Sequence, residues 1–159
     1  MSLAQQAVGE LAAAQEFFNR STRNLPESLS GFAPAPGMMT AAQMVAHVAQ
    51  TLDWFVEGAF RAEGFDMDFE AHIEKTNGYE SLAAARGWFE KSVAAASATL
   101  GSKSDAELME LLPAGPIMGR MPRMAIIGAI TDHTAHHRGA LSVYARLNGI
   151  VPPMPYMDM

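Results

Sequence analysis

One stretch of the chain, residues 126–144, limits the possible folds more than any other. It reads IIGAITDHTAHHRGALSVY, and its large apolar residues recur at steps of three and four, the period of an α-helix with one buried face. The residues on that face are Ile126, Ile130, His133, His137, Leu141 and Tyr144. A buried ring nitrogen costs about 1–3 kcal/mol unless it finds a partner. Because the two histidines are four residues apart, their rings project side by side and can bind one metal ion together.

Helical periodicity extends over four segments: residues 2–22, 40–60, 79–100 and 122–147. Links rich in proline and glycine separate them. No segment alternates apolar and polar residues over a length that predicts a sheet. The expected fold is therefore all-α, a single four-helix bundle domain over residues 1–159, with long loops between helices 2 and 3 and between helices 3 and 4.

Two connecting segments carry expectations of their own. Residues 58–78 are predicted to form a less regular linker with a short turn of helix. The tail IVPPMPYMDM, residues 150–159, cannot be helical because of its prolines. Its apolar content predicts that it lies back on the domain or on a partner subunit.

Composition excludes several classes of function. The net charge is −6, which argues against a nucleic-acid binder because such a protein needs a basic face. Cysteine is absent, so neither a disulfide nor a sulfur-ligated metal can form. No stretch reaches the roughly 18 consecutive apolar residues of a membrane span, and the first residues lack the pattern of a signal peptide. We therefore expect a cytoplasmic protein without nucleic-acid or membrane partners.

A third histidine falls on or beside the buried face of the second helix. This is His47, in the segment AAQMVAHVAQTLDWFVEGAF. With His133 and His137 it would present three neutral imidazoles and leave one coordination position open, as in a catalytic divalent metal site. Zinc, nickel and iron all accept imidazole, so ligand type does not choose among them. Hydrogen-bonded core histidines without a metal are the plainer interpretation, and the spacing alone leaves both open.

Three other residues each allow two interpretations. His136 could replace His137 as the partner of His133, since an i, i+3 pair is also possible, but it lies off the apolar stripe and we interpret it as flanking. His72 lies in a polar stretch and is interpreted as a solvated loop residue. Arg86 interrupts the stripe of the third helix, and it either extends to the bundle edge or points at a pocket that holds an anionic substrate.

The segment HTAHHRGALSVYARLNG, residues 133–149, resembles the DinB/YfiT-like family, which carries an H-x-x-x-H-R-G-Q-L segment on its last helix. FAPAPGMMTAAQMVAHVAQ, residues 32–50, is similar to the family's proline-containing lead into the second helix with its single histidine. The tail GIVPP fits as well. The resemblance covers nearly the whole chain.

The resemblance implies a four-helix bundle, often dimeric, with a divalent metal on three histidines, which in this chain are His47, His133 and His137. The expected ion is zinc or nickel, with iron as a third candidate. The family's usual glutamine after Arg-Gly is Ala140 here, so any hydrogen bond by which that glutamine supports the site would be missing. The expected partners are a small-molecule substrate, a low-molecular-weight thiol and a second copy of the chain in a homodimer.

Two classes of function follow. The first is a metal-dependent enzyme of the thiol S-transferase or hydrolase type that the wider family resembles, in which the metal activates a thiol or a water. Thr51, Arg86 and Tyr144 are candidate substrate contacts, whereas no general base is identifiable and the catalytic residues stay unassigned. The alternative is a non-enzymatic, metal-containing dimeric module for sensing, binding or stress. A bundle with no metal at all is the third possibility.

Overall fold

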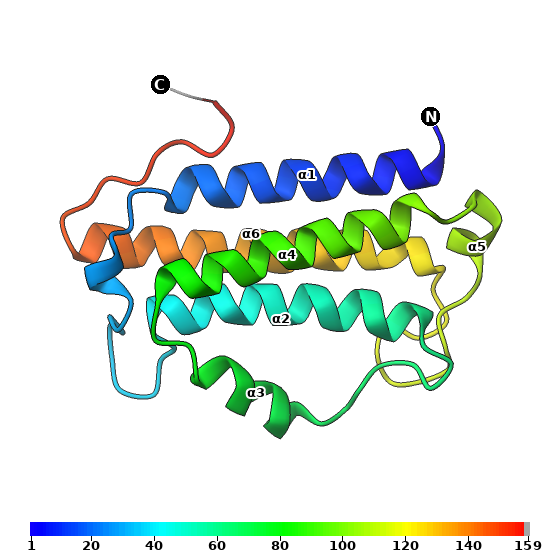
Figure 1. Ribbon diagram of the computed structural model, residues 1–159, viewed down its shortest axis with the longest axis horizontal. Coiled ribbons are helices and arrows are strands. Elements are labelled where there is room, and N and C mark those ends of the chain that lie inside the picture. The colour runs from blue at the N-terminus through cyan, green and yellow to red at the C-terminus, as the bar shows by residue number, and fades with distance from the viewer. Residues whose placement is uncertain (158–159) are drawn as a thin grey trace.

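The computed structural model describes residues 1–157, and four long helices account for more than half of that range (Figure 1). They are α1 (Leu3–Thr22), α2 (Ala41–Phe60), α4 (Leu82–Gly101) and α6 (Ile126–Leu147). The connections contain α3 (Phe69–Asn77), α5 (Asp105–Met109) and the 3₁₀ turns Glu27–Leu29 and Arg123–Ala125. Within the described residues β-structure is limited to an isolated bridge between Leu111 and Pro122, which confirms the predicted all-α fold. None of the described helices combines the length and apolarity needed to cross a membrane.

The four long helices form a bundle in which each contacts two neighbours. α1 packs against α4 and α6, and α2 packs against the same two helices. α1 and α6 run in one direction and α2 and α4 in the other, as the colour gradient of Figure 1 shows. Because α2 and α4 are parallel, the chain has to return along the bundle between them, and the long connection that does so contains α3. The predicted four-helix bundle is confirmed.

Local signals in the sequence determine where the helices begin and end. At the start of α2 the hydroxyl of Thr40 accepts a hydrogen bond from the backbone N–H of Gln43 at 3.2 Å, and the Gln43 side chain accepts one from the N–H of Thr40 at 2.9 Å. The helices α1 and α5 begin with the same reciprocal capping motif. After α6 the chain turns at Gly149, whose φ of 73° is a left-handed conformation that glycine adopts without strain.

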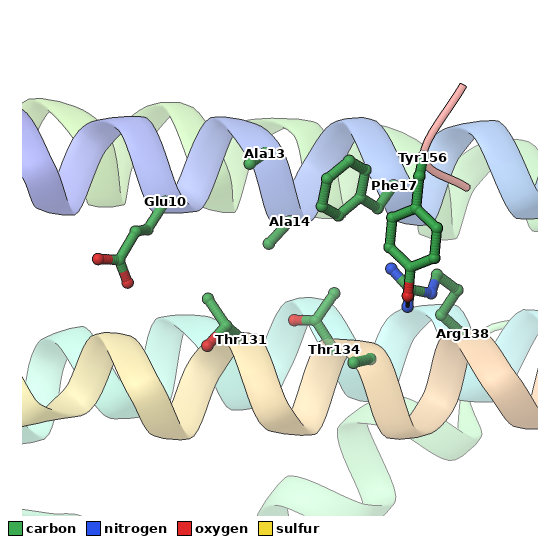
Figure 2. Close-up of a pocket in the computed structure, with 9 residues that line it drawn as sticks. Glu10, Ala13, Ala14, Phe17, Thr131, Thr134, Arg138 and Tyr156 are labelled. Carbon is green, nitrogen blue, oxygen red and sulfur yellow. Dashed lines mark hydrogen bonds between the residues drawn. The ribbon is translucent and has the colours of Figure 1, made fainter. Parts of the chain in front are cut away.

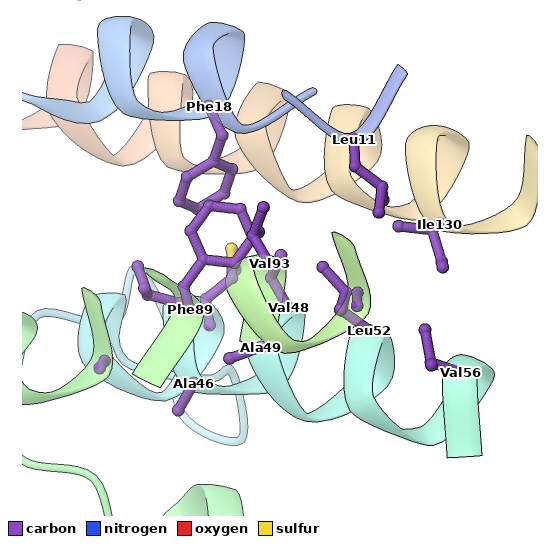
Figure 3. Packing of buried hydrophobic residues seen from close by; sticks show 14 of the residues in the cluster. Leu11, Phe18, Ala46, Val48, Ala49, Leu52, Val56, Phe89, Val93 and Ile130 are labelled. Carbon is purple, nitrogen blue, oxygen red and sulfur yellow. The ribbon is translucent and has the colours of Figure 1, made fainter. Parts of the chain in front are cut away.

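The core lies between the four long helices and holds α2 and α6 at a fixed separation (Figure 3). Phe18 of α1 and Phe89 of α4 are in contact, with ring centroids 4.8 Å apart. Leu11, Leu52 and Ile130 are also buried in this cluster. Each large apolar side chain buried in this way contributes about 1.5–3 kcal/mol relative to its exposed state. The side chains on the face that α2 turns toward α6 are therefore positioned by this packed core.

The connection between α2 and α4 is more ordered than the sequence predicts. Residues 58–78, expected to be an irregular linker with a short helical turn, contain the end of α2 and the nine-residue helix α3. Asp68 caps α3 by accepting a hydrogen bond from the N–H of Ala71 at 3.1 Å. The indole N–H of Trp54 donates to the carbonyl oxygen of Asp66 at 2.6 Å, which ties the segment before α3 to α2. As a result, α3 packs against the outside of α2.

The tail after α6 packs beside α1. The carbonyl oxygen of Pro155 accepts a hydrogen bond from the guanidinium of Arg20 at 2.9 Å, and the ring of Tyr156 contacts that of Phe17, with centroids 5.1 Å apart. Figure 2 shows Tyr156 beside Arg138 of α6, at one end of a cavity of about 330 Å³ between α1 and α6. The prediction that the tail lies back on the domain is confirmed for its described part; its last two residues lie outside that part.

Candidate metal centre

Three histidines converge at one point between α2 and α6. His47 comes from α2, and His133 and His137 come from consecutive turns of α6. The Nε2 atom of His133 lies 3.1 Å from Nε2 of His47 and 3.1 Å from Nε2 of His137. One ligand atom from each ring lies within 4.8 Å of the others. The three residues predicted from the sequence thus form a group that could hold a metal ion.

The spacing of these nitrogens fits a shared cation better than a set of hydrogen bonds. A neutral ring nitrogen carries either one proton or one lone pair, so Nε2 of His133 can complete only one of its two 3.1 Å contacts as an ordinary hydrogen bond. Three imidazole nitrogens at about 2.0–2.1 Å from a tetrahedral ion would lie about 3.3 Å from one another. The two separations that involve His133, 3.1 Å each, are close to that value, and the third pair lies within 4.8 Å. Three nitrogen donors leave a fourth coordination position open on a tetrahedral ion.

Burial keeps the three rings neutral. Desolvation lowers the pKa of His47, lowers the pKa of His133 to about 3 and lowers the pKa of His137 to about 4. The neighbouring histidines contribute to these lowered pKa values of His133 and His137, because a second positive charge so close is unfavourable. At neutral pH the rings therefore offer lone pairs, the form that a cation requires.

One side of the His137 ring has no partner. Its Nδ1 atom is buried and makes no hydrogen bond within the described residues. Histidines that bind metals usually donate this second ring N–H to an oxygen, which fixes the orientation of the ring. Ala140, one turn further along α6, is the position where the sequence predicts the loss of a supporting hydrogen bond, and its methyl group cannot accept one.

The histidine group borders a cavity of about 530 Å³ between α2 and α3, with His47 and His133 in its wall. Its other lining residues are Met39, Gln50, Thr51, Trp54, Phe55, Phe69, His72, Ile73 and Thr76. A volume of this size suits a small organic molecule. Of the three substrate contacts predicted from the sequence, Thr51 lies in this wall.

The structure does not bring Arg86 or Tyr144 to the cavity. The guanidinium of Arg86 donates to the hydroxyl of Thr22 at 2.9 Å and to its carbonyl oxygen at 2.6 Å, which ties α4 to the end of α1. This geometry agrees with the interpretation of Arg86 as a residue of the bundle edge and not with a cation aimed at the pocket. Tyr144 is buried, and its hydroxyl donates to the carbonyl oxygen of Met39 at 2.9 Å, so it reaches the cavity only through that residue.

The remaining two histidines, His136 and His72, differ in their exposure and surroundings. His136 is exposed and lies outside the converging group, as its place off the apolar stripe predicts. The prediction that His72 is a solvated loop residue is wrong: it lies on α3, its side chain is 22% exposed, and it lines the cavity. Its Nε2 atom is buried without a hydrogen-bond partner, since Oδ2 of Asp66 at 3.7 Å is too far to accept. The error arose because α3 folds back against α2.

Other cavity residues escaped the sequence analysis for separate reasons. Gln50 follows His47 by three residues and so shares its face of the helix, and this spacing could have identified Gln50 as a polar residue near the site. Trp54 lies on the same helix, but its role depends on the segment that folds over it. Phe69 carries no such signal, because nothing in a short polar helix indicates which element it contacts.

Comparisons with known proteins agree with this architecture. The sequence model of the DinB superfamily matches residues 10–141. A DinB-like protein from Bacillus cereus has a similar structure, with a TM-score of 0.65 at 22% identity, and the match covers 95% of this chain and 93% of that chain. A DinB-like protein from Bacillus subtilis has a TM-score of 0.69 at 19% identity, covering 97% and 99% of the two chains. A protein from Streptococcus pneumoniae has a TM-score of 0.73 at 13% identity, covering 92% and 91%.

At such low identities the structural likeness shows the fold alone. None of the curated proteins compared matches this chain. The superfamily model, in contrast, spans most of the sequence and includes all three converging histidines. The chain therefore belongs to the DinB superfamily.

Proposed function

We propose that this chain is a divalent-metal-dependent enzyme in which His47, His133 and His137 hold the metal. Zinc or nickel is the favoured ion and iron a further candidate. The reaction would be transfer to a thiol, or hydrolysis, of a small molecule bound in the adjoining cavity, and the thiol would be a low-molecular-weight one. The observation that supports the proposal is the convergence of three neutral imidazoles in the wall of a cavity of small-molecule size.

A divalent cation held by three neutral ligands would keep its full charge and supply a Lewis acid that activates a thiol or a water. The chain's own contribution is to keep the imidazoles unprotonated, to place Thr51 beside them, and to line the cavity with aromatic side chains. The lining residues include no carboxylate or amine, and the one imidazole outside the metal group, His72, has its Nε2 atom buried, so no general base is open to the cavity. Thiol transfer is favoured over hydrolysis, because a thiol has a pKa of about 8.5 and is deprotonated without a general base more readily than water.

A substrate panel on metal-loaded protein tests this proposal. Protein purified without a histidine tag is loaded with zinc, nickel or iron in turn. It is then assayed with low-molecular-weight thiols paired with electrophilic acceptors, and with ester and amide substrates. We expect thiol-dependent turnover that stops on chelation and returns with the metal, and that is lost in His47→Ala. Stoichiometric metal without turnover across the whole panel would contradict an enzyme and favour the non-enzymatic metal-containing module.

A further inference from the structure

The wall of the cavity beside the histidines suits an uncharged, apolar occupant. It contains three aromatic side chains, Trp54, Phe55 and Phe69, together with Met39 and Ile73. None of the lining residues is a lysine, arginine, aspartate or glutamate. Away from the histidines, an ionic group would lose its hydration there without gaining a counter-charge. The wall therefore selects for neutral molecules with a large apolar surface.

One polar side chain in this wall has unused hydrogen-bonding capacity. Gln50 is only 9% exposed, and its amide makes no hydrogen bond to any described residue. A carboxamide offers two donors and one acceptor, so it can pair with a group that donates, accepts or does both. Because Gln50 lies three residues after His47, the two side chains share a face of α2. A ligand that reaches this amide therefore also reaches the histidine group.

A second unpartnered polar atom comes from α3, on the other side of the cavity. Nε2 of His72 is buried and has no hydrogen-bond partner, with the nearby Asp66 carboxylate 3.7 Å away. Phe69 and Ile73 on the same helix line the cavity, yet they are 48% and 55% exposed. This helix therefore presents apolar side chains at the mouth and an unsatisfied imidazole behind them.

We propose that the cavity binds an uncharged aromatic molecule that bears a hydroxyl group. Its ring lies against Trp54 and Phe69, and its hydroxyl pairs with the amide of Gln50. A hydroxyl both donates and accepts, so it can pair with either end of the carboxamide. This inference rests on the proposed function only in naming the substrate class of that site, because binding itself requires no metal.

Three matched probes test the proposal on metal-free protein by equilibrium dialysis: 2-naphthol, 2-methylnaphthalene and 2-naphthoate. The ring is the same in each, and the substituent changes from a hydroxyl to a methyl to a carboxylate. We expect 2-naphthol to bind roughly fivefold more tightly than 2-methylnaphthalene, the factor that one hydrogen bond supplies. We expect 2-naphthoate to bind at least about tenfold more weakly than 2-naphthol, because its charge finds no partner in the wall.

Variants then identify the residues responsible. Gln50→Leu, which replaces the amide by an apolar group of similar size, should bring the ratio of the two neutral probes to about one while 2-methylnaphthalene still binds. His72→Leu should leave the ratio unchanged, because Nε2 of His72 is buried behind the apolar side chains of α3. Gln15→Leu, on α1 and outside the cavity, is the matched control and should leave it unchanged.

Two results would overturn the inference: no binding of either neutral probe, or a naphthol preference that survives in Gln50→Leu. These outcomes are separate from the failure of the enzyme proposal, which is decided by metal content and turnover. Probe binding without turnover would support the proposed ligand class and contradict the enzyme. Turnover without probe binding would support the enzyme and contradict the proposed ligand class.

Discussion

His136 and His137 follow one another in the chain, yet one faces solvent and the other faces two more imidazoles. The difference arises from the 100° turn between successive helical residues. His137→Ala should therefore reduce bound metal from about one equivalent to below about one tenth, because it removes one of three ligands. His136→Ala should keep the metal. Mass-spectrometric metal analysis of tag-free protein measures both, and circular dichroism checks that the helix content is retained. Equal metal content in the two variants would remove His137 from the ligand set.

The lowered pKa values of the buried histidines predict a pH dependence of stability. In the folded, metal-free protein the pKa of His133 is about 3 and that of His137 about 4. In the unfolded chain both histidines have the ordinary pKa of 6.5. Between these values the unfolded state binds more protons, so unfolding becomes easier as the pH falls from 7 to 5. Above pH 7 the effect is absent. Melting temperatures of metal-free protein over this range should fall, and they should fall less steeply in His133→Leu. A variant with the unchanged slope would contradict this origin of the pH dependence.

The positions of the three converging histidines could be predicted from the sequence, but the contacts of the side chains around them could not. His47, His133 and His137 could be predicted because helical spacing alone sets which face each occupies. Arg86 could not be assigned, because its partner Thr22 belongs to a different helix, 64 residues away in the chain. His72 was misassigned for the same reason: its surroundings are created by tertiary packing.

Among the elements, α3 depends most on a single close contact. Gly58 of α2 lies under the ring of Phe65, and a Cβ atom at this position would come within 2.3 Å of that ring. The ring also contacts Trp54, with centroids 4.8 Å apart, so displacing it disturbs the segment that leads into α3. The absence of a side chain at this position is therefore what lets the segment lie against α2.

Alanine at Gly58 and alanine at Gly87, a helical glycine with no close neighbour, should change the free energy of unfolding in opposite directions. Gly58→Ala should lower the free energy of unfolding by about 1–3 kcal/mol, because the Phe65 ring has to move. Gly87→Ala, in α4 where nothing lies within 4 Å, should raise it by about 0.5–1 kcal/mol through helix propensity. Urea denaturation of the two variants compares them directly. Stabilisation by both substitutions would show that the Phe65 contact is not maintained in solution.

The four long helices were predictable because each carries several turns of periodic apolar residues. The capping residue Thr40 added the start of α2, and Ser104 that of the short helix α5. In α3 the one buried residue is Thr76, and the apolar pair Phe69 and Ile73 spans a single turn, which is too short to predict a helix. Its cap, Asp68, was the available signal.

For the molecule as a whole, we predict a homodimer from apolar side chains that are exposed around the end of α6. Val143 and Leu147 lie one turn apart on α6 and are 54% and 60% exposed, and Val151, which follows the turn at Gly149, is 71% exposed. Large side chains exposed together in this way are typical of contact surfaces. We expect light scattering coupled to size exclusion to give a dimer. Leu147→Glu should shift it toward the monomer, whereas Arg146→Glu, one residue away, should shift it less. A monomeric wild-type chain would contradict the prediction.

The separation of the histidines along the chain has a consequence for the order of events in the cell. His47 is translated 86 residues before His133, and the last two imidazoles leave the ribosome with α6. No ion can therefore be captured by all three rings while the earlier helices are emerging. An ion bound by all three rings would therefore be acquired only after α6 has left the ribosome, from whatever ions the surrounding medium offers at that moment.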